Sequence, residues 1–479
     1  MADTIAAAIA ANRFGLGARP GEIERIAADP RGALRAQLTG AAPLLVDANL
    51  PASADVIERE VQLRMERKEF KQRIAGEVPN DAPNDAATQA ALQKLPALLR
   101  PIYIDDAVAR VRSGVATERP MLERLVHFWS NHFAVSVDKQ AVLGIAGAFE
   151  REAIRPHVLG SFQDLLLAVE QHPAMLLYLD NAQSVGPNSD AARKLSRRGF
   201  GFSAPRQKIG INENLAREIL ELHTLGVNGG YTQADVTEFA KVISGWSIGG
   251  GQGRLRGGEP GRYYFREALH EPGTRHLLGR SYRESGYQQG VAVLQDLAAL
   301  PETAQHLATK LCRHFIADEP PQTAVDRVAR VFLATSGDLP SVYRALIDAP
   351  EAWSEPLSKY KTPSDYIYSS WRALQLPVPD GPKAIAPFEL LGQRNFSPGS
   401  PAGWPDRAAD WDGSASLLKR LEWADQVSQR IGTRVAAAEL APQALGATLS
   451  NHTRVAIARA ESGTQALTLL MASPEFMRR

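Results

Sequence analysis

The fold class is decided by the stretch NENLAREILELHTLG, residues 212–226, in which leucine and isoleucine recur at helical spacing. With about 100° per residue and Leu215 at the origin, Ile219 falls at about 40° and Leu222 at about 340°, so one face is apolar. Similar periodicity runs through most of the chain, and β-hairpin signals are nearly absent. The sequence therefore predicts a mainly α protein, a large multi-helix domain with long polar or Gly-rich loops and few or no β-strands.

Two ionisable residues interrupt this apolar face, Glu218 near about 300° and His223 near about 80°. A buried carboxylate or imidazole must be paired, hydrogen-bonded or neutral, the condition under which functional pKa values arise. Because the two side chains are about 140° apart, they cannot chelate one ion as an i, i+4 pair would. Glu218 thus has two interpretations, a salt bridge to an arginine of a neighbouring helix or a catalytic or ligand role.

A second amphipathic helix is predicted for MLERLVHFWSNHFA, residues 121–134. On its helical wheel His132 falls among apolar residues and is the inward histidine, whereas His127 lies on the outward side. Glu123, His127 and Ser130 share that outward face, a triad-like arrangement that helical spacing alone produces by coincidence. For His132 the alternative to a functional role is a satisfied core histidine.

Helix starts and loops give the organisation of the chain. Thr232 with Asp235 resembles a capping box, Thr362-Pro363-Ser364-Asp365 places proline at the first helical position, and Asp338 is a further cap. A charged helix is predicted at 54–75, followed by a Pro/Asn/Asp-rich loop at 76–88, and exposed loops at 184–210 and 247–263. We expect an N-terminal helical region at 1–100, a central helical domain carrying the site at 101–350, and a C-terminal helical region at 351–479.

Composition excludes several classes of protein. The chain has 479 residues, with 54 Lys plus Arg against 53 Asp plus Glu, so bulk charge gives no support for nucleic-acid or membrane-surface binding. Its single cysteine, Cys312, excludes an internal disulfide or Cys-rich metal site. No segment has the roughly 20 apolar residues of a membrane span. The N-terminal stretch lacks a basic n-region, which favours a cytoplasmic location.

Motif searches are mostly negative. The sequence contains no P-loop, GxSxG, HExxH or Cys-x-x-Cys motif, and Gly15-Leu16-Gly17 alone does not support a dinucleotide site. Further polar clusters are Leu269-His270-Glu271 and Arg313-His314-Phe315.

An ordered series of motifs resembles the bacterial "domain of unknown function 1800" family nearly from end to end. The matching strings are NRFGLG (12–17), FWSNHF (128–133), PAMLLYLDN (173–181), NENLARE (212–218), ELHTLGV (221–227), SGW (244–246), GWP (403–405) and SPEF (473–476). The resemblance implies a partner similar to the alkaline phosphatase and sulfatase superfamily, because genes of such proteins commonly neighbour this family. It also implies frequent export, so passage into the periplasm on a signal-bearing partner is the alternative to the cytoplasm. Ser130 stands where many relatives carry histidine, which argues against a metal site on that helix.

Three functions follow from these residues, and the first is a hydrolase acting on carbohydrate. Glu218 would be the general acid or base, His132, His223 and His270 would orient substrate or carry protons, and Asp180 or Glu271 would supply the second carboxylate that glycosidases need. Trp246 and Trp404 would provide stacking surfaces. The remaining predicted substrate-binding residues are Asn131, Asn214 and Arg217.

The second function is a noncatalytic companion of the phosphatase- or sulfatase-like partner, with Glu218 and His132 as core pairs. The third is a metal protein in which His132, Glu218, His223 and His270 converge from separate helices. Its weakness is the absence of a short-range chelating pair. No particular cofactor is indicated by the sequence.

Overall fold

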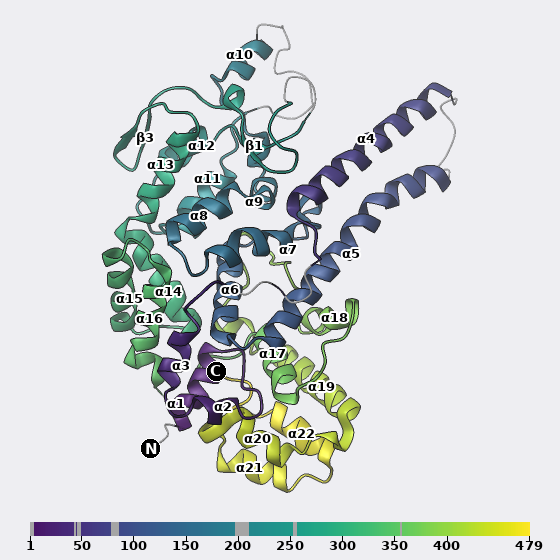
Figure 1. Ribbon diagram of the computed structural model, residues 1–479, viewed down its shortest axis with the longest axis vertical. Helices are drawn as coiled ribbons and strands as arrows, with labels where there is room; N and C mark the ends of the chain where they lie inside the picture. The colour runs from purple at the N-terminus through teal and green to yellow at the C-terminus, as the bar shows by residue number, and fades with distance from the viewer. Residues whose placement is uncertain are drawn as a thin grey trace.

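The computed structural model describes residues 4–42, 45, 49–77, 86–196, 210–251, 256–354 and 357–479. It shows an elongated, mainly helical body from which one long helical hairpin projects (Figure 1). Parts of the three predicted loops at 76–88, 184–210 and 247–263 lie outside the described residues. The predicted mainly α class is confirmed.

The strands in the described part are short and form two separate antiparallel pairs. Strand β1 (Trp246–Ile248) pairs with β2 (Tyr263–Phe265), and β3 (Arg275–Leu277) pairs with β4 (Arg280–Tyr282). The β1–β2 pair brackets the predicted Gly-rich loop, so the two ends of that loop are held together by backbone hydrogen bonds.

Helices α1 to α12 form the first half of the described chain, and among them α5 contacts α6. They are α1 (Thr4–Ile9), α2 (Glu22–Ile26), α3 (Pro30–Ala36), α4 (Ser53–Glu77), α5 (Ala86–Ala116), α6 (Pro120–His132), α7 (Ala146–Phe149), α8 (Phe162–Gln171), α9 (Pro173–Tyr178), α10 (Asp190–Ser196), α11 (Asn214–Glu218) and α12 (Gln233–Val242). π-Helical turns occur at Ala10–Phe14, Glu150–Ile154 and Ile219–His223. Short 3₁₀ turns lie at Gln140–Val142, Arg155–His157 and Asn181–Gln183.

The second half adds two further groups of helices. They are α13 (Tyr287–Ala298), α14 (Pro301–Phe315), α15 (Gln322–Ala334), α16 (Leu339–Asp348), α17 (Pro363–Leu374), α18 (Pro382–Leu390), α19 (Ser414–Ile431), α20 (Ala437–Leu445), α21 (Asn451–Ala458) and α22 (Gly463–Met471). The 3₁₀ turns here are Glu267–Leu269, Pro350–Trp353, Ala408–Asp410, Gly432–Arg434 and Gly446–Thr448.

Two large hydrophobic cores, and a small third cluster around α1 and α2, hold these helices together. The larger core joins α6, α8, α9 and α11–α16, and includes Trp129, Phe133 and Phe162. The second core joins α17–α22 around Tyr366 and Trp423. Burial of such aromatic side chains supplies most of the packing energy of each core.

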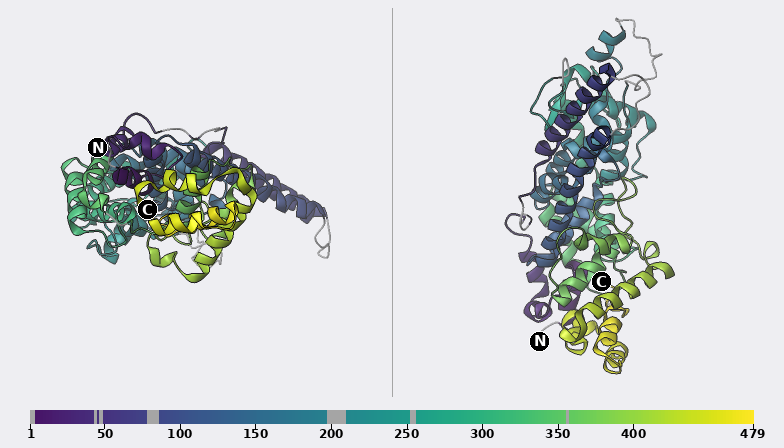
Figure 2. Two further views of the ribbon diagram at one scale, coloured as in Figure 1. Left: turned by 90° about the horizontal axis from the view of Figure 1, so that it is seen from below. Right: turned by 90° about the vertical axis from the view of Figure 1, so that its right-hand side faces the viewer.

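The hairpin of α4 and α5 extends away from the body, as the left view of Figure 2 shows. Helix α4 confirms the charged helix predicted at 54–75. The base of α5 packs against α6 and α17, so this helix is anchored in the body while its other end projects. The boundary that the sequence predicts at residue 100 falls inside helix α5, which is continuous through that residue.

The predicted helix starts are confirmed. Capping boxes form at Thr232 with Asp235 and at Thr362 with Asp365, and Asp338 caps α16 by accepting from the Ser341 amide. These caps depend only on neighbouring residues, so sequence alone identifies them, and each contributes about 1 kcal/mol. The cap of α17 also fixes Asp365 at the centre of the molecule.

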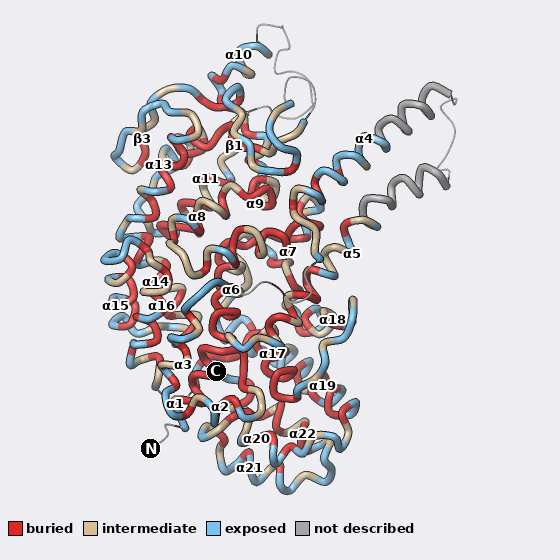
Figure 3. Tube along the Cα trace, viewed as in Figure 1, coloured by how far each residue is buried: buried red, intermediate tan, exposed pale blue. Residues whose placement is uncertain are grey.

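Helix α6 is buried on both faces, apolar and polar (Figure 3). On its polar face Glu123 is fully buried and Arg124 is 2% exposed. His127, predicted to point outward, is instead covered by other elements and only partly exposed. The wheel analysis was wrong on this point because it identifies the polar side of a helix but not what packs against that side. Among the described helices, none is long and apolar enough to cross a membrane.

Candidate functional site

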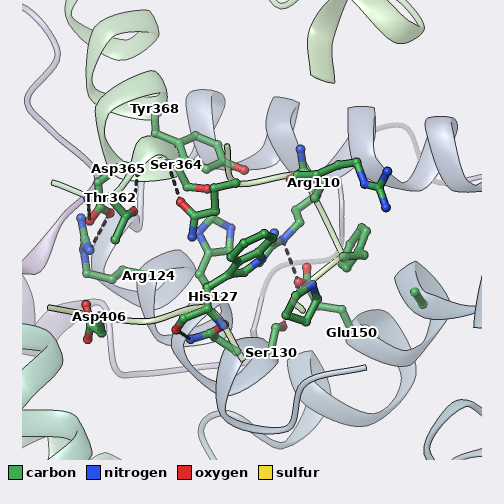
Figure 4. A pocket seen from close by; sticks show the side chains of 18 of the residues that line it. Arg110, Arg124, His127, Ser130, Glu150, Thr362, Ser364, Asp365, Tyr368 and Asp406 are labelled. Atoms are coloured by element: carbon green, nitrogen blue, oxygen red, sulfur yellow. Dashed lines mark hydrogen bonds and ion pairs between the residues drawn. The ribbon is translucent and has the colours of Figure 1, made fainter. Parts of the chain in front are cut away.

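A pocket of about 890 Å³, including its open mouth, lies against the polar face of α6 (Figure 4). We call it the central pocket. Helix α5 contributes Arg110, the N-terminal part of α17 contributes Thr362, Ser364, Asp365 and Tyr368, and the segment 393–406 closes another side. From α6 come Arg124, His127, Ser130 and Asn131.

Asp365 is held ionised between two arginines. Its Oδ1 lies 2.9 Å from Nη1 of Arg124, and its Oδ2 lies 2.8 Å from Nε of Arg479. Burial would raise the pKa of Asp365, but Arg124 and Arg479 outweigh burial and hold that pKa far below its usual range. The carboxylate is therefore charged at neutral pH and is fixed in place by ion pairs as well as by its capping role.

A second ionic cluster, around Glu150, lies in another wall of the central pocket. Glu150 accepts from Ser130 Oγ at 2.9 Å and pairs with Arg110 Nε at 2.8 Å and Arg155 Nη2 at 3.0 Å. Arg155 also pairs with both oxygens of the fully buried Glu123. Burial raises the pKa of Glu150, and Arg110 and Arg155 more than reverse that shift, so Glu150 is an anion. Balanced buried charges of this kind fix side-chain positions.

His127 lies between the two clusters. Its Nε2 is 3.7 Å from Oε1 of Glu123, and its ring packs against Tyr368 with 5.1 Å between centroids. Burial, reinforced by Arg110 and Arg155, holds the pKa of His127 well below its ordinary value. The imidazole is therefore neutral and offers one donor and one acceptor.

His314, at the end of α14, forms a pair with Asp406. The Nδ1 atom of His314 lies 2.9 Å from Oδ2 of Asp406, and Nε2 of His314 is buried with no hydrogen-bond partner in the described part of the chain. Burial lowers the pKa of His314 to about 4, with Asp406 opposing that effect. This is the arrangement of an Asp–His pair in which the aspartate orients a neutral imidazole.

Four residues that line the central pocket carry buried polar atoms left unpaired by the described residues. These atoms are Nε2 of His127, Nε2 of His314, the hydroxyl of Tyr368, and both amide atoms of Asn395. Most buried polar atoms in proteins find a hydrogen-bond partner, and each unpaired one is costly. Such a concentration around one pocket suits a ligand with several hydroxyl groups.

The predicted residues His132 and His223 meet in the core. The Nε2 of His132 donates to the carbonyl of His223 at 3.2 Å, and Nδ1 of His223 lies 2.7 Å from Oε1 of the fully buried Glu170. The two predicted helices therefore do lie together, with His223 on a π-helical turn that follows α11. His132 borders a second pocket, described below, rather than the central one.

Glu218 lines neither of these two pockets. It is partly buried, and within the described residues its carboxylate makes no hydrogen bond or ion pair, so no arginine of that part of the chain forms the salt bridge that one interpretation expects. Burial, with Glu221 and Glu170 adding to it and His223 opposing, raises the pKa of Glu218.

Asp180 and Glu271, the expected second carboxylates, also lie outside both pockets. Asp180 is exposed and pairs with Lys139 at 2.7 Å. Glu271 is buried and accepts two hydrogen bonds of 2.6 Å from the backbone and side-chain nitrogens of Asn188. Both carboxylates have structural partners.

Trp246 and His270 are buried beside the β1–β2 pair. Trp246 is fully buried and packs against Gly290 of α13, where an added Cβ would lie 2.4 Å from the indole, so it presents no face for stacking. The Nδ1 of His270 donates to the Ser244 carbonyl at 3.0 Å. Because a carbonyl only accepts, Nδ1 of His270 carries the proton.

The remaining predicted binding residues divide into two groups. Asn214 is exposed, and Arg217 pairs with Glu213 at 3.3 Å on the surface of α11. Asn131 and Trp404 line both pockets and bond each other twice, through Asn131 Nδ2 to the Trp404 carbonyl at 2.9 Å and through the Trp404 amide to Asn131 Oδ1 at 2.7 Å.

Sequence reasoning missed the ionic residues of the central pocket and the pair of His314 with Asp406. His314 belongs to a polar cluster that the sequence did single out, and Asp406 directly follows the GWP motif. The polar cluster could have drawn attention to His314, and the GWP motif could have drawn attention to Asp406. The contact between His314 and Asp406 could not be predicted, since 92 residues separate them in the chain.

The fold and the pocket together define a mainly α protein with a polar, ion-paired pocket at its centre. Within the described residues no group of three or more His, Cys, Asp or Glu side chains is arranged to hold a metal ion. The chain belongs to the family described as "Protein of unknown function (DUF1800)", whose family model matches residues 9–478. No curated protein and no solved structure matched the chain.

Proposed function

We propose that this protein is a hydrolase whose substrate is a polyhydroxylated molecule of the carbohydrate class, bound in the central pocket. The observation that carries the proposal is the Nε2 atom of His314, which has no hydrogen-bond partner among the described residues. Asp406 orients the His314 ring, and three other residues with unpaired polar atoms line the same pocket. A neutral imidazole in this position is suited to accept a proton from an attacking water.

Recognition of the substrate would come from neutral groups. Tyr368 is buried, and burial raises the pKa of its phenol, so the hydroxyl stays protonated and available as a donor. The Asn395 amide offers both a donor and an acceptor, and Trp404 supplies an aromatic surface. Sugar hydroxyl groups match this mixture because each of them both donates and accepts.

The ionisation states of the carboxylates around the central pocket support the same proposed function. The nearby carboxylates Asp365, Glu150 and Asp406 are all held as anions, so none of them stores a proton for a leaving group at neutral pH. The chemistry that these residues favour is attack by a water whose proton passes to Nε2 of His314 and is then given to the departing oxygen, with Asp406 stabilising the transient imidazolium.

A matched pair of tyrosine variants tests the proposal. Tyr368 and Tyr263 both have buried hydroxyls without a partner among the described residues, but only Tyr368 lines the pocket. Wild type, Tyr368→Phe and Tyr263→Phe would be assayed for turnover of a panel of glycosides and sugar esters. We expect Tyr368→Phe to raise KM about 2- to 12-fold, the value of one hydrogen bond, without lowering Tm.

Two results would contradict the proposed function. One is the absence of turnover across the whole panel, and the other is an equal effect of the two tyrosine substitutions. The companion of a phosphatase- or sulfatase-like protein stays a prediction, and a pull-down with such a partner would test it separately.

A further inference from the structure

A second pocket of about 740 Å³, including its open mouth, lies beside the central one. We call it the adjacent pocket. The two pockets share Asn131, His314, Trp404, Pro405 and Asp406, so one wall is common to both. A ligand in the central pocket would therefore have the adjacent pocket as its nearest extension.

Lys310, on α14, is the notable residue of the adjacent pocket. Its side chain is partly buried, and within the described residues its ammonium makes no hydrogen bond or ion pair. By contrast, Nζ of Lys359 has a carboxylate partner, since it lies 2.6 Å from Oδ1 of Asp318. Burial lowers the pKa of Lys310 to about 8, with Asp406 opposing the shift and Arg313 adding to it. A partly desolvated cation without a counter-charge attracts an anion.

The other charges around the adjacent pocket do not neutralise Lys310. Arg313 uses its Nε to donate to the Asp318 carbonyl at 3.1 Å, which leaves its charge uncompensated by a carboxylate. Asp406 is already engaged by His314 at 2.9 Å and by Lys359 at 3.4 Å.

The remaining charged groups lie at the rim or in the wall. Asp410 is exposed, and Arg407 pairs with Glu319 at 3.2 Å at the surface. In the wall, burial and the nearby Lys310 hold the pKa of His132 well below its ordinary value, so His132 adds no charge. The net character of the adjacent pocket is therefore cationic, and Lys310 and Arg313 supply it.

We propose that Lys310 and Arg313 bind the anionic group of a substrate whose hydroxyl-bearing part occupies the central pocket. The substrate class is then an acidic sugar, carrying either a carboxylate or a phosphate. The inference rests on the proposed function, which it narrows from carbohydrates in general to charged ones. Lysine and arginine are the usual partners of both anions, lysine as a point charge and arginine through its planar fork.

Direct binding, measured by calorimetry at pH 7 without any turnover, tests this inference. The probes are glucose, glucuronate, glucose 6-phosphate and inorganic phosphate. We expect at least one acidic sugar to bind wild type about ten-fold more tightly than glucose. Lys310→Met should remove that preference and leave glucose binding unchanged, whereas Lys310→Arg, which keeps the charge, should retain most of it.

The control is Lys419→Met, since Lys419 is exposed on α19, away from both pockets, and should behave as wild type. Equal binding of neutral and acidic sugars overturns the inference, and so does a Lys310→Met protein of unchanged Tm that keeps the preference. Binding of inorganic phosphate lost in Lys310→Met, together with no turnover of any glycoside, would support the anion site and reject the hydrolase. The better of glucuronate and glucose 6-phosphate identifies the anion.

Discussion

His314 Nδ1 lies 2.9 Å from Oδ2 of Asp406, although 92 residues separate the two in the chain. Burial would raise the pKa of Asp406, but His314 and Lys359 outweigh it and keep the carboxyl ionised. Because an ionised carboxylate only accepts, Nδ1 of His314 must carry the proton, which leaves Nε2 as a lone pair. The contact therefore fixes the tautomer of His314, which lines both the central and the adjacent pocket.

Replacing Asp406 by asparagine tests the tautomer. An amide can turn its own N–H toward Nδ1 of His314 and so favour the wrong tautomer, which would lower kcat about 10²- to 10⁴-fold. The measurement is kcat at pH 7, together with nitrogen chemical shifts of the His314 ring. Asp425→Asn, at an exposed position of α19 that lines neither pocket, is the control. A kcat for Asp406→Asn within two-fold of wild type, at unchanged Tm, would remove the pair from the mechanism (about two-fold being the scatter of mutant kinetics).

The pH dependence follows from the same histidine. The pKa of His314 is about 4 in the folded protein, and the base form must be unprotonated to accept a proton. Activity should therefore fall as the pH drops through about 4 and be level above about 6. Stability should follow the same direction, since the unfolded chain takes up this proton at about pH 6.5 and the folded chain does not. A pH–rate profile whose acidic limb is centred near neutrality would contradict this assignment.

Glu218→Gln tests the carboxylate singled out from the sequence. Its raised folded pKa means that stability is lost as pH rises through that pKa, so a neutral glutamine should leave the free energy of unfolding unchanged within about 0.5 kcal/mol or raise it slightly at pH 8. Glu170→Gln is the contrasting variant in the same cluster. It weakens the buried contact to His223 and should cost about 1.5–3 kcal/mol in a urea titration. Equal losses in both variants would show that Glu218 has a buried structural partner.

Lys361 offers a test of buried charge beside the central pocket. Its side chain is 2% exposed, its Nζ lies 4.5 Å from the centroid of Phe476, and burial lowers its pKa to about 7 against the opposing effect of Asp365. Lys361→Met should raise the free energy of unfolding by about 1–4 kcal/mol at pH 6. The gain should shrink as pH rises from about 7 toward about 10.5. In this range the wild-type lysine is neutral when folded, and the free-energy cost of removing its proton becomes smaller as the pH approaches the unfolded pKa.

Thermal unfolding across about pH 6 to about pH 11 would measure this gain, since that range spans the folded pKa of about 7 and the unfolded pKa of about 10.5. Lys419→Met, on the exposed face of α19, should change the free energy of unfolding by less than about 0.5 kcal/mol. A gain that stays constant with pH would mean that Lys361 keeps its proton in the folded protein throughout this range, so that its pKa is not lowered.

Local features of the fold were predictable from the sequence because neighbouring residues determine them. The helices and the caps at Thr232, Asp338 and Thr362 follow from spacing alone. The orientation of His127 was not predictable, since the polar face of α6 is covered by the cluster of Glu123 and Arg155, whose members come from different elements.

The candidate site shows the same limit. Asn131 and Trp404 were named from the sequence and do line the pockets, because they belong to recognisable motifs. Trp246 was expected to face a ligand, yet Gly290 on a distant helix leaves room for it to be buried. Contacts between residues far apart in the chain decide such outcomes, and helical periodicity carries no information about them.

Turnover by His314→Asn, compared with Glu218→Gln on the same panel of sugar substrates, tests the central claim most directly. The claim is that catalysis depends on His314 in the central pocket. It predicts that His314→Asn lowers kcat at least about 100-fold while Tm and substrate binding stay close to wild type, and that Glu218→Gln keeps kcat within about two-fold. Full activity in His314→Asn with activity lost in Glu218→Gln would contradict the account and place the chemistry on α11.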